Sequence, residues 1–104
     1  MKEVAMPFTD EKIQQVWEKG KVVESYDRNI WRKDDAQAWI RRNHYGNRDS
    51  QYGWEIDHIH PESEGGVDEL LNLRPLQWKN NAAKQAGRIK HAVTSSGNQN
   101  IDAE

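Results

Sequence analysis

Residues 54–59, written WEIDHI, limit the fold of this chain more than any other segment, because they alternate with the period of a β-strand. Trp54, Ile56 and His58 fall on one side of such a strand, and the residues between them fall on the other. Pro61 follows closely and ends strand pairing, because proline has no backbone N–H to donate. We therefore expect a strand over residues 54–59 that stops before Pro61.

The residues after this strand predict a loop, a second strand and a helix. Residues 61–70, PESEGGVDEL, have the composition of a loop. We interpret its acidic side chains mainly as solubilising, with contact to a bound metal as the alternative: Glu62, Glu64, Asp68 and Glu69. Residues 73–76 read as a short strand. Residues 77–89 read as a helix with one stripe formed by Trp78, Ala82, Gln85 and Ile89. Two strands and one helix are too small to be stable alone, so the N-terminal half must complete the core of an α+β domain.

The N-terminal half begins with a predicted helix over residues 10–19. Thr9 can cap this helix, and its apolar stripe consists of Ile13, Val16 and Trp17. Short strands are expected after it, over residues 22–26 and 36–42, although residues 36–42 are also compatible with a helix. Residues 45–53, YGNRDSQYG, have the composition of a loop.

Length and composition predict one small domain. The chain has 104 residues, of which 35% are hydrophobic, and its five tryptophans partly compensate for the small apolar content. We expect a single domain over residues 1–93, with the motif core in residues 53–91 and a disordered tail over residues 94–104. Cysteine is absent, which excludes disulfides and fits a reducing compartment. No segment is apolar enough for a signal peptide or a membrane span, so a cytoplasmic location is expected.

Charge is unevenly distributed along a chain whose net charge is −2. Residues 71–101 contain no acidic side chain, yet they contain basic ones, namely Arg74, Lys79, Lys84, Arg88 and Lys90. Such a segment is compatible with a phosphate-binding face or with a helix surface that only lacks acids, and both interpretations stay open. Arg41 and Arg42 are open in the same way, between a clamp on a DNA backbone and a solvated surface.

The most specific signal is an ordered set of short motifs in residues 53–84, GWEIDHIHPESEGGVDELLNLRPLQWKNNAAK. It contains D-H-I-x-P, G-G, D-x-L-x-N-L, P-L and W-x-x-N-x-x-K in this order. A D-H pair alone is common, whereas the full set at these separations is specific. The segment resembles the HNH endonuclease family. That resemblance implies a ββα-metal core, here flanked by an N-terminal helix and short strands.

The resemblance also implies a role for each matching residue. His58 takes the position of the general base that activates water, and Asn72 takes the middle position, which orients the histidine or braces the loop. Asp57 and Asn81 take the metal-ligand positions, the second of which is a histidine in many relatives. The cysteine pairs of some relatives are missing, so no separate structural zinc is expected.

The residue types agree with this chemistry. Phosphodiester hydrolysis needs a base that works near neutral pH, which imidazole provides, and a cation that neutralises charge on the phosphate. Asp57 and Asn81 offer hard oxygen ligands, which suit Mg²⁺ or Mn²⁺ better than Zn²⁺ or Ni²⁺. His60 could contact the substrate or favour a softer ion such as Zn²⁺, but we favour its interpretation as a partly exposed histidine before a proline turn.

Two geometric expectations follow from the predicted elements. Asp57 and His58 are neighbours and would point to opposite sides of a regular strand, so they can serve one phosphate only if the strand ends or bulges there. Asn80 and Asn81 lie about 100° apart on a helix. Asn81 would then align with Lys84 and Arg88, which selects it, rather than Asn80, for the site.

These inferences favour a metal-dependent endonuclease that acts on DNA, as a monomer or a homodimer, without a membrane. It is expected to nick with little sequence specificity, because so short a chain shows no major-groove reading module. Contacts to nucleic acid are expected from Lys84, Arg88, Lys79, Arg41 and Arg42. The alternatives are a non-catalytic nucleic-acid-binding module on the same scaffold and a ribonuclease or toxin-like effector.

Overall fold

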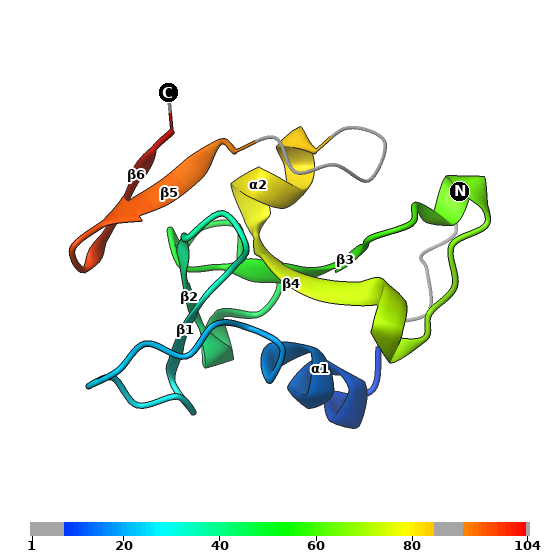
Figure 1. Cartoon of the computed structure of the whole chain (residues 1–104), viewed down its shortest axis with the longest axis horizontal. Helices are drawn as coiled ribbons and strands as arrows, with labels where there is room; N and C mark the ends of the chain where they lie inside the picture. Colours follow the sequence, from blue (N-terminus) through cyan, green and yellow to red (C-terminus); the bar gives the residue numbers. More distant parts are fainter. Residues whose placement is uncertain (1–7, 85–90, 104) are drawn as a thin grey trace.

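The computed structural model describes residues 8–84 and 91–103. In these ranges the helices are α1 (Asp10–Trp17) and α2 (Trp78–Ala83), and the strands are β1 (Trp31–Lys33), β2 (Trp39–Arg41), β3 (Trp54–His58), β4 (Leu73–Gln77), β5 (Val93–Ser96) and β6 (Gln99–Asp102). Short 3-10 turns occupy Arg42–His44, Glu62–Glu64 and Leu70–Asn72. The strands pair consecutively into antiparallel ribbons, β1 with β2, β3 with β4, and β5 with β6 (Figure 1). This mixture of helices and small antiparallel sheets confirms the α+β class.

Helix α1 forms where its sequence predicts. The Thr9 hydroxyl accepts a hydrogen bond from the Lys12 N–H at 3.1 Å, which caps the first turn. The predicted stripe is buried, and Trp17 lies against Trp54 of β3 with 5.4 Å between the ring centroids. The helix packs beside β4 (Figure 1). The core therefore lies between α1 and the β3–β4 ribbon.

Strands β3 and β4 also match their predicted positions to within one residue. Their pairing is regular from Trp54 opposite Gln77 to His58 opposite Leu73. The loop that follows β3 then turns back so closely that a Cβ on Gly66 would lie 1.8 Å from the carbonyl oxygen of His60. A larger residue at position 66 would push the loop away from the end of β3.

The strands predicted before β3 need correction. Residues 22–26 do not form a strand, because Ser25 adopts a positive φ of 78° in a turn. The β-pairing nearest to them is an isolated bridge between Lys21 and Lys33. Residues 36–42 form a strand only at Trp39–Arg41, because Gln37, with a φ of 67°, turns the chain. Strand β1 was not predicted, and it forms because β2 supplies its partner.

The predicted helix over residues 77–89 is too long within the described chain. Helix α2 ends at Ala83, and Lys84 has an extended backbone, while residues 85–90 lie outside the described ranges. The predicted stripe is also wrong, because Ala82 is exposed and the buried residue of α2 is Asn80. No helix in the described ranges is both long and apolar enough to traverse a membrane.

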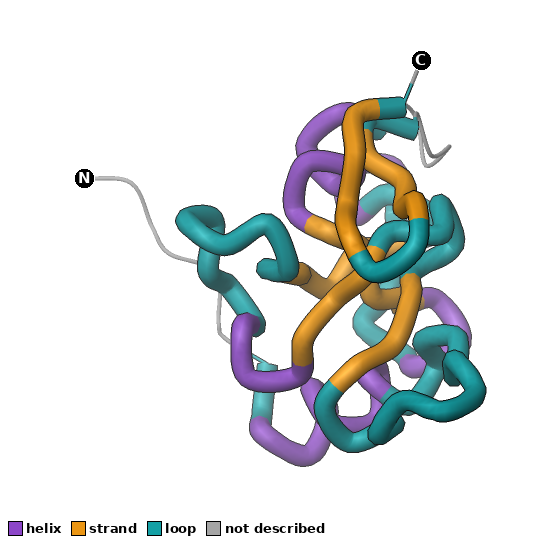
Figure 2. Tube along the Cα trace, turned by 90° about the vertical axis from the view of Figure 1, so that its left-hand side faces the viewer, coloured by secondary structure: helices purple, strands orange, loops and turns teal. Residues whose placement is uncertain are grey.

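The C-terminal segment is a β-hairpin where a disordered tail was expected. Strands β5 and β6 pair from Val93 opposite Asp102 to Ser96 opposite Gln99. The Asn100 side chain accepts a hydrogen bond from the Trp39 N–H at 2.7 Å and donates one to the Trp39 carbonyl at 2.9 Å. Figure 2 shows this hairpin as two strands running side by side below the C-terminal label. The hairpin is thus attached to the edge of β2.

A buried polar cluster around Asp34 joins three parts of the fold. One Asp34 oxygen accepts the N–H groups of Ala36 and Ala38 at 2.9 Å, and the other accepts the Gln77 N–H at 2.8 Å and the Asn80 amide at 3.0 Å. Asn80 in turn accepts the Val93 N–H at 2.8 Å. Burial raises the pKa of Asp34 more than these hydrogen bonds lower it. The cluster holds the β1–β2 turn, the start of α2 and β5 together.

Candidate active site

The end of β3 places Asp57 and His58 on opposite sides of a regular strand. Pairing continues through Asp57 opposite Arg74 and His58 opposite Leu73, so there is no bulge, and the strand ends at His58. The Asp57 side chain is fully buried, whereas the His58 side chain keeps 14% of its surface exposed. The predicted base and the predicted metal ligand therefore have separate surroundings.

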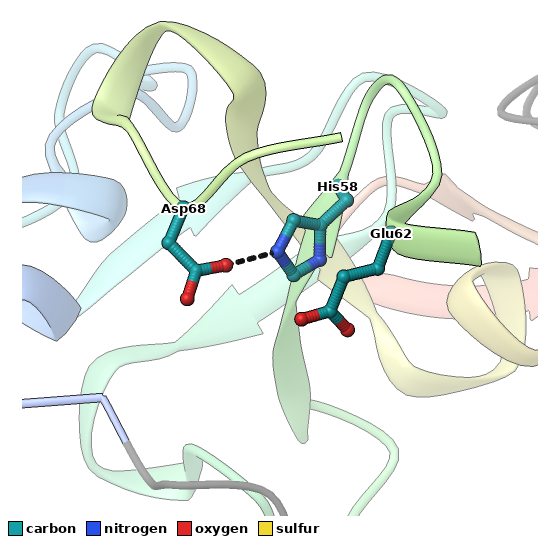
Figure 3. A group of neighbouring side chains, drawn as sticks. All are labelled: His58, Glu62 and Asp68. Carbon is teal, nitrogen blue, oxygen red and sulfur yellow. Dashed lines mark hydrogen bonds and ion pairs between the residues drawn. The ribbon is translucent and has the colours of Figure 1, made fainter. Parts of the chain in front are cut away.

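On the His58 side, the loop after β3 brings two acidic side chains to the imidazole (Figure 3). The Nε2 atom of His58 lies 2.6 Å from Oδ1 of Asp68, and Glu62 lies beside the ring. One ligand atom from each of these three residues lies within 4.8 Å of the others, an arrangement that could hold a metal ion. The Nδ1 atom of His58 has no hydrogen-bond partner among the described residues.

On the Asp57 side, basic groups surround the carboxylate. Arg74 Nε donates to Oδ2 at 2.7 Å, and the Lys84 ammonium forms an ion pair with Oδ1. Within the described part of the chain, Oδ1 accepts no hydrogen bond, although the Lys84 ammonium is close to it. The two groups attract as opposite charges, and this attraction holds over a wider range of angles than a hydrogen bond does.

Glu55 shares the Asp57 side of β3 and connects it to α2. Its Oε1 accepts a hydrogen bond from Asn81 Nδ2 at 2.8 Å, and Arg48 binds both of its oxygens, at 2.6 and 2.9 Å. Burial alone would raise the pKa of Glu55, but the hydrogen bonds from Arg48 and Asn81 outweigh burial and lower that pKa. Asn81 therefore faces the side of β3 that carries Asp57.

The two neighbouring asparagines of α2 have different surroundings, as the helix phasing predicts. Asn80 is fully buried and bonds to Asp34 and Val93, away from β3. Asn81 is half-buried and bonds to Glu55. Asn81 is therefore the asparagine that lies beside the candidate site.

Asn72 braces the loop rather than the imidazole. Its Oδ1 accepts the His60 N–H at 2.7 Å, and its Nδ2 donates to the carbonyls of His60 at 3.1 Å and Val67 at 2.8 Å. These bonds hold together the two ends of the loop that carries Asp68. Of the two roles expected for Asn72, the contacts match the loop-bracing one.

His60 and the predicted DNA-contacting residues are placed as follows. The His60 ring bonds to the Glu64 carbonyl at 2.9 Å, within its own loop. Lys79 is exposed, whereas Lys84 is paired with Asp57. Arg42 donates to Gln14 at 2.9 Å, Arg41 lies over the Trp31 ring, and Arg88 is outside the described residues.

Sequence reasoning missed the side chains that contact the candidate residues. Glu62 and Asp68 were interpreted mainly as solubilising loop acids, with a metal contact as the alternative, and neither was predicted to contact His58. No role was considered for Glu55 as a partner of Asn81. Asp68 stands four residues before Asn72 inside the D-x-L-x-N-L motif, which was the available signal. Lys84 was expected to contact DNA, and Arg74 was counted only in the basic segment. Neither was predicted to pair with Asp57, because that pairing depends on how β3, β4 and α2 pack.

Comparison with known proteins gives one match. Residues 43–86 match the model of a family described as HNH endonuclease. No curated protein and no solved structure matches the chain. The matched segment includes β3, β4 and the whole of α2, and with them Asp57, His58, Asn72 and Asn81. Residues 43–86 thus match the HNH endonuclease family, the family that the motif predicts.

Proposed function

We propose that this protein is a metal-dependent endonuclease that hydrolyses DNA phosphodiester bonds on a ββα-metal core formed by β3, β4 and α2. The family match supports a nuclease acting on nucleic acid. The observation that carries the proposal is the contact between His58 and Asp68 at the end of β3, at 2.6 Å.

This contact gives His58 the form that a general base needs. An ionised carboxylate only accepts hydrogen bonds, so the proton of the neutral imidazole lies on Nε2, facing Asp68. The lone pair is then on Nδ1, the nitrogen without a described partner, where it can take a proton from water. The Asp68 charge also stabilises the imidazolium that forms. Asp68 thus acts as a positioning residue for His58.

The Asp57 side fits a divalent cation. Its buried Oδ1 lacks a hydrogen bond among the described residues and already attracts the ammonium of Lys84. A carboxylate oxygen and the Asn81 amide oxygen are hard donors of the kind that Mg²⁺ and Mn²⁺ prefer. Asp57 and Asn81 would hold the ion, which when bound would neutralise charge on the phosphate and the leaving oxygen.

The donor group of His58, Glu62 and Asp68 is a competing location for a metal, better suited to Zn²⁺ or Ni²⁺ because it includes an imidazole. A metal held by Nδ1 there would use the lone pair that the base needs. We therefore assign the ion to the Asp57 side and the base to His58.

The remaining parts of the proposal concern the substrate. Each chain carries one site, so a monomer cuts one strand per event, and a homodimer could cut both. Lys79, Arg41 and Arg42 supply positive charge for the DNA backbone, without a module that reads sequence. The second candidate function is a non-catalytic nucleic-acid-binding module, which the pairing of Asp57 with both Arg74 and Lys84 favours.

The proposal is tested by nicking of supercoiled plasmid with Mg²⁺ or Mn²⁺, and with a chelator as control. We expect nicking that the chelator abolishes and that His58→Ala reduces by roughly 10²-fold or more. His60→Ala is the matched control, because it removes a nearby histidine whose ring bonds only within its loop. Slower migration of DNA in a gel mobility-shift assay, without cutting, would favour the binding module. Preferential cleavage of RNA would favour the ribonuclease.

A further inference from the structure

We infer that an aromatic hollow formed by β1, β2 and the β5–β6 turn binds an unpaired base of single-stranded nucleic acid. The inference rests on the proposed function in taking nucleic acid as the substrate, but its test does not depend on cleavage. Figure 1 places β1, β2 and the hairpin toward one end of the molecule and the loop after β3 toward the other. The hollow is thus separate from the candidate active site.

The hollow has a volume of about 320 Å³ and is lined by Tyr26, Trp31, Trp39, Tyr52, Asn98 and Gln99. That volume lies at the lower end of the range for small-ligand sites, roughly 300–1,000 Å³. Four of the six lining side chains are aromatic and none is acidic. The chain thus gathers a large share of its aromatic residues around a space that is open to solvent.

The rings are fixed by contacts with one another. Tyr26 stacks on Trp39 at 4.8 Å between centroids and 24° between planes, and Trp31 meets Tyr52 edge-on at 4.9 Å. Trp39 is buried and donates its indole N–H to the Gly97 carbonyl at 2.8 Å, which joins the cluster to the hairpin turn. Tyr26 nevertheless stays 39% exposed. A buried ring that supports an exposed one provides a firm stacking surface, which distinguishes this cluster from an ordinary core.

Charge selects the class of ligand. Lys33 Nζ lies 4.7 Å from the centre of the Trp39 ring, and the Arg41 guanidinium lies 5.0 Å from the centre of the Trp31 ring. Aromatic cages can bind quaternary ammonium groups, but here two cations already lie over the rings and would repel such a ligand. They would attract a phosphate. A ligand with a flat ring that stacks on the aromatic side chains and a phosphate that pairs with the cations is a nucleotide.

Exposed amides complete the site. Asn98 lies in the turn of the hairpin and Gln99 is the first residue of β6, and each side-chain amide can both donate and accept hydrogen bonds at the edge of a base. A base inside a duplex presents neither its face nor its pairing edge, so only an unpaired base can use this combination. The ligand is therefore a single strand, and both DNA and RNA offer the unpaired base and the phosphate that this hollow would bind.

The size of the molecule sets the length of the probe. Its longest extent is 40 Å. At about 3.4 Å for each nucleotide of a strand, a strand of about twelve nucleotides is long enough to follow the whole molecule. We therefore choose a single-stranded 12-mer as the probe.

The experiment measures fluorescence anisotropy of a labelled 12-mer in chelator, so that nothing is cut. The arms are single-stranded DNA, single-stranded RNA and a duplex of the same sequence. Tyr26→Ala and Tyr52→Ala should each weaken single-strand binding about tenfold, as expected for the loss of one stacking partner. Tyr26→Phe and Tyr52→Phe are matched controls, which keep the ring and should bind within about twofold of the wild type. Circular dichroism checks folding, and Asn98→Ala, in an exposed turn, serves if Tyr52→Ala does not fold.

Each result decides for or against the inference. The inference is supported if single-stranded DNA or RNA binds more tightly than the duplex and if both alanine variants weaken that binding. The strand that binds more tightly then identifies the ligand as DNA or RNA. Equal binding by the wild type and Tyr26→Ala overturns the inference. Duplex binding as tight as single-strand binding overturns it too, as does displacement of the 12-mer by a trimethyl-lysine peptide. Plasmid nicking by the same preparations tests the proposed function separately, because loss of nicking with intact 12-mer binding contradicts only the nuclease.

Discussion

Nε2 of His58, the last residue of β3, lies 2.6 Å from Oδ1 of Asp68 in the loop that follows. The loop is held in place for this contact by Asn72, which bonds to the backbone of both His60 and Val67. The histidine is thereby presented with Nε2 bound and with Nδ1 lacking a hydrogen-bond partner among the described residues. Its partner is an exposed loop acid, a type of residue that is usually interpreted as solubilising.

The first prediction concerns this partner. Asp68→Ala should reduce the kcat of plasmid nicking about 10- to 100-fold with little change in KM, because the imidazole loses the group that fixes its proton and orientation. Asp68→Asn should recover part of the activity, since its carbonyl can still accept from Nε2. Glu69→Ala is the matched control in the same loop. Full activity of Asp68→Ala would contradict the positioning role.

The second prediction concerns Lys84. Lys84→Ala removes the ammonium from Asp57 Oδ1, so a divalent ion should bind several-fold more tightly, measured by calorimetry without DNA. The same change should reduce the free energy of unfolding by about 1–3 kcal/mol, because a buried carboxylate loses a charged partner. Lys79→Ala, at an exposed position of α2, controls for loss of one positive charge. Unchanged metal affinity in Lys84→Ala would argue against an ion at Asp57.

The third prediction separates the asparagines of α2. Asn80→Ala should lower the free energy of unfolding by about 3 kcal/mol, because it leaves the buried N–H of Val93 without a partner and removes one of the two hydrogen bonds to an oxygen of Asp34. Asn81→Ala should unfold like the wild type but need more metal for half-maximal nicking. Urea titrations and metal titrations measure the two effects. An active Asn81→Ala beside a folded but inactive Asn80→Ala would reverse the assignment.

The fourth prediction is a pH dependence of stability. The folded state lowers the pKa of Glu55, so the ionised form is favoured in the folded state. Its contribution is therefore complete above the ordinary pKa of a glutamate, about 4.3, and is lost as the pH falls through the lowered value. Glu55→Gln should flatten this acid-side loss in urea midpoints measured below about pH 5, whereas Glu24→Gln, on an exposed turn, should not. Identical acid profiles for Glu55→Gln and the wild type would contradict the prediction.

Elements with strong local signals were predicted correctly. Helix α1 has its own cap and apolar stripe, and the β3–β4 segment has alternating apolar and polar residues in β3 and a proline that ends it. Residues close in sequence are therefore enough to specify these elements. Strand β1, the short length of α2 and the β5–β6 hairpin were missed. Strand β1 depends on its distant partner β2, and the hairpin depends on the contact of Asn100 with Trp39.

For the candidate site, the sequence by itself determined the residue types and the family that residues 43–86 match, because the ordered motif in residues 53–84 can be read without any knowledge of packing. Tertiary structure alone decided how those residues are used. Strand alternation separates Asp57 from His58, and loop closure brings Asp68 to the imidazole. The packing of α2 on β3 brings Lys84 to Asp57. Charges far apart in sequence find partners only when the chain folds, since electrostatic attraction depends on distance in space.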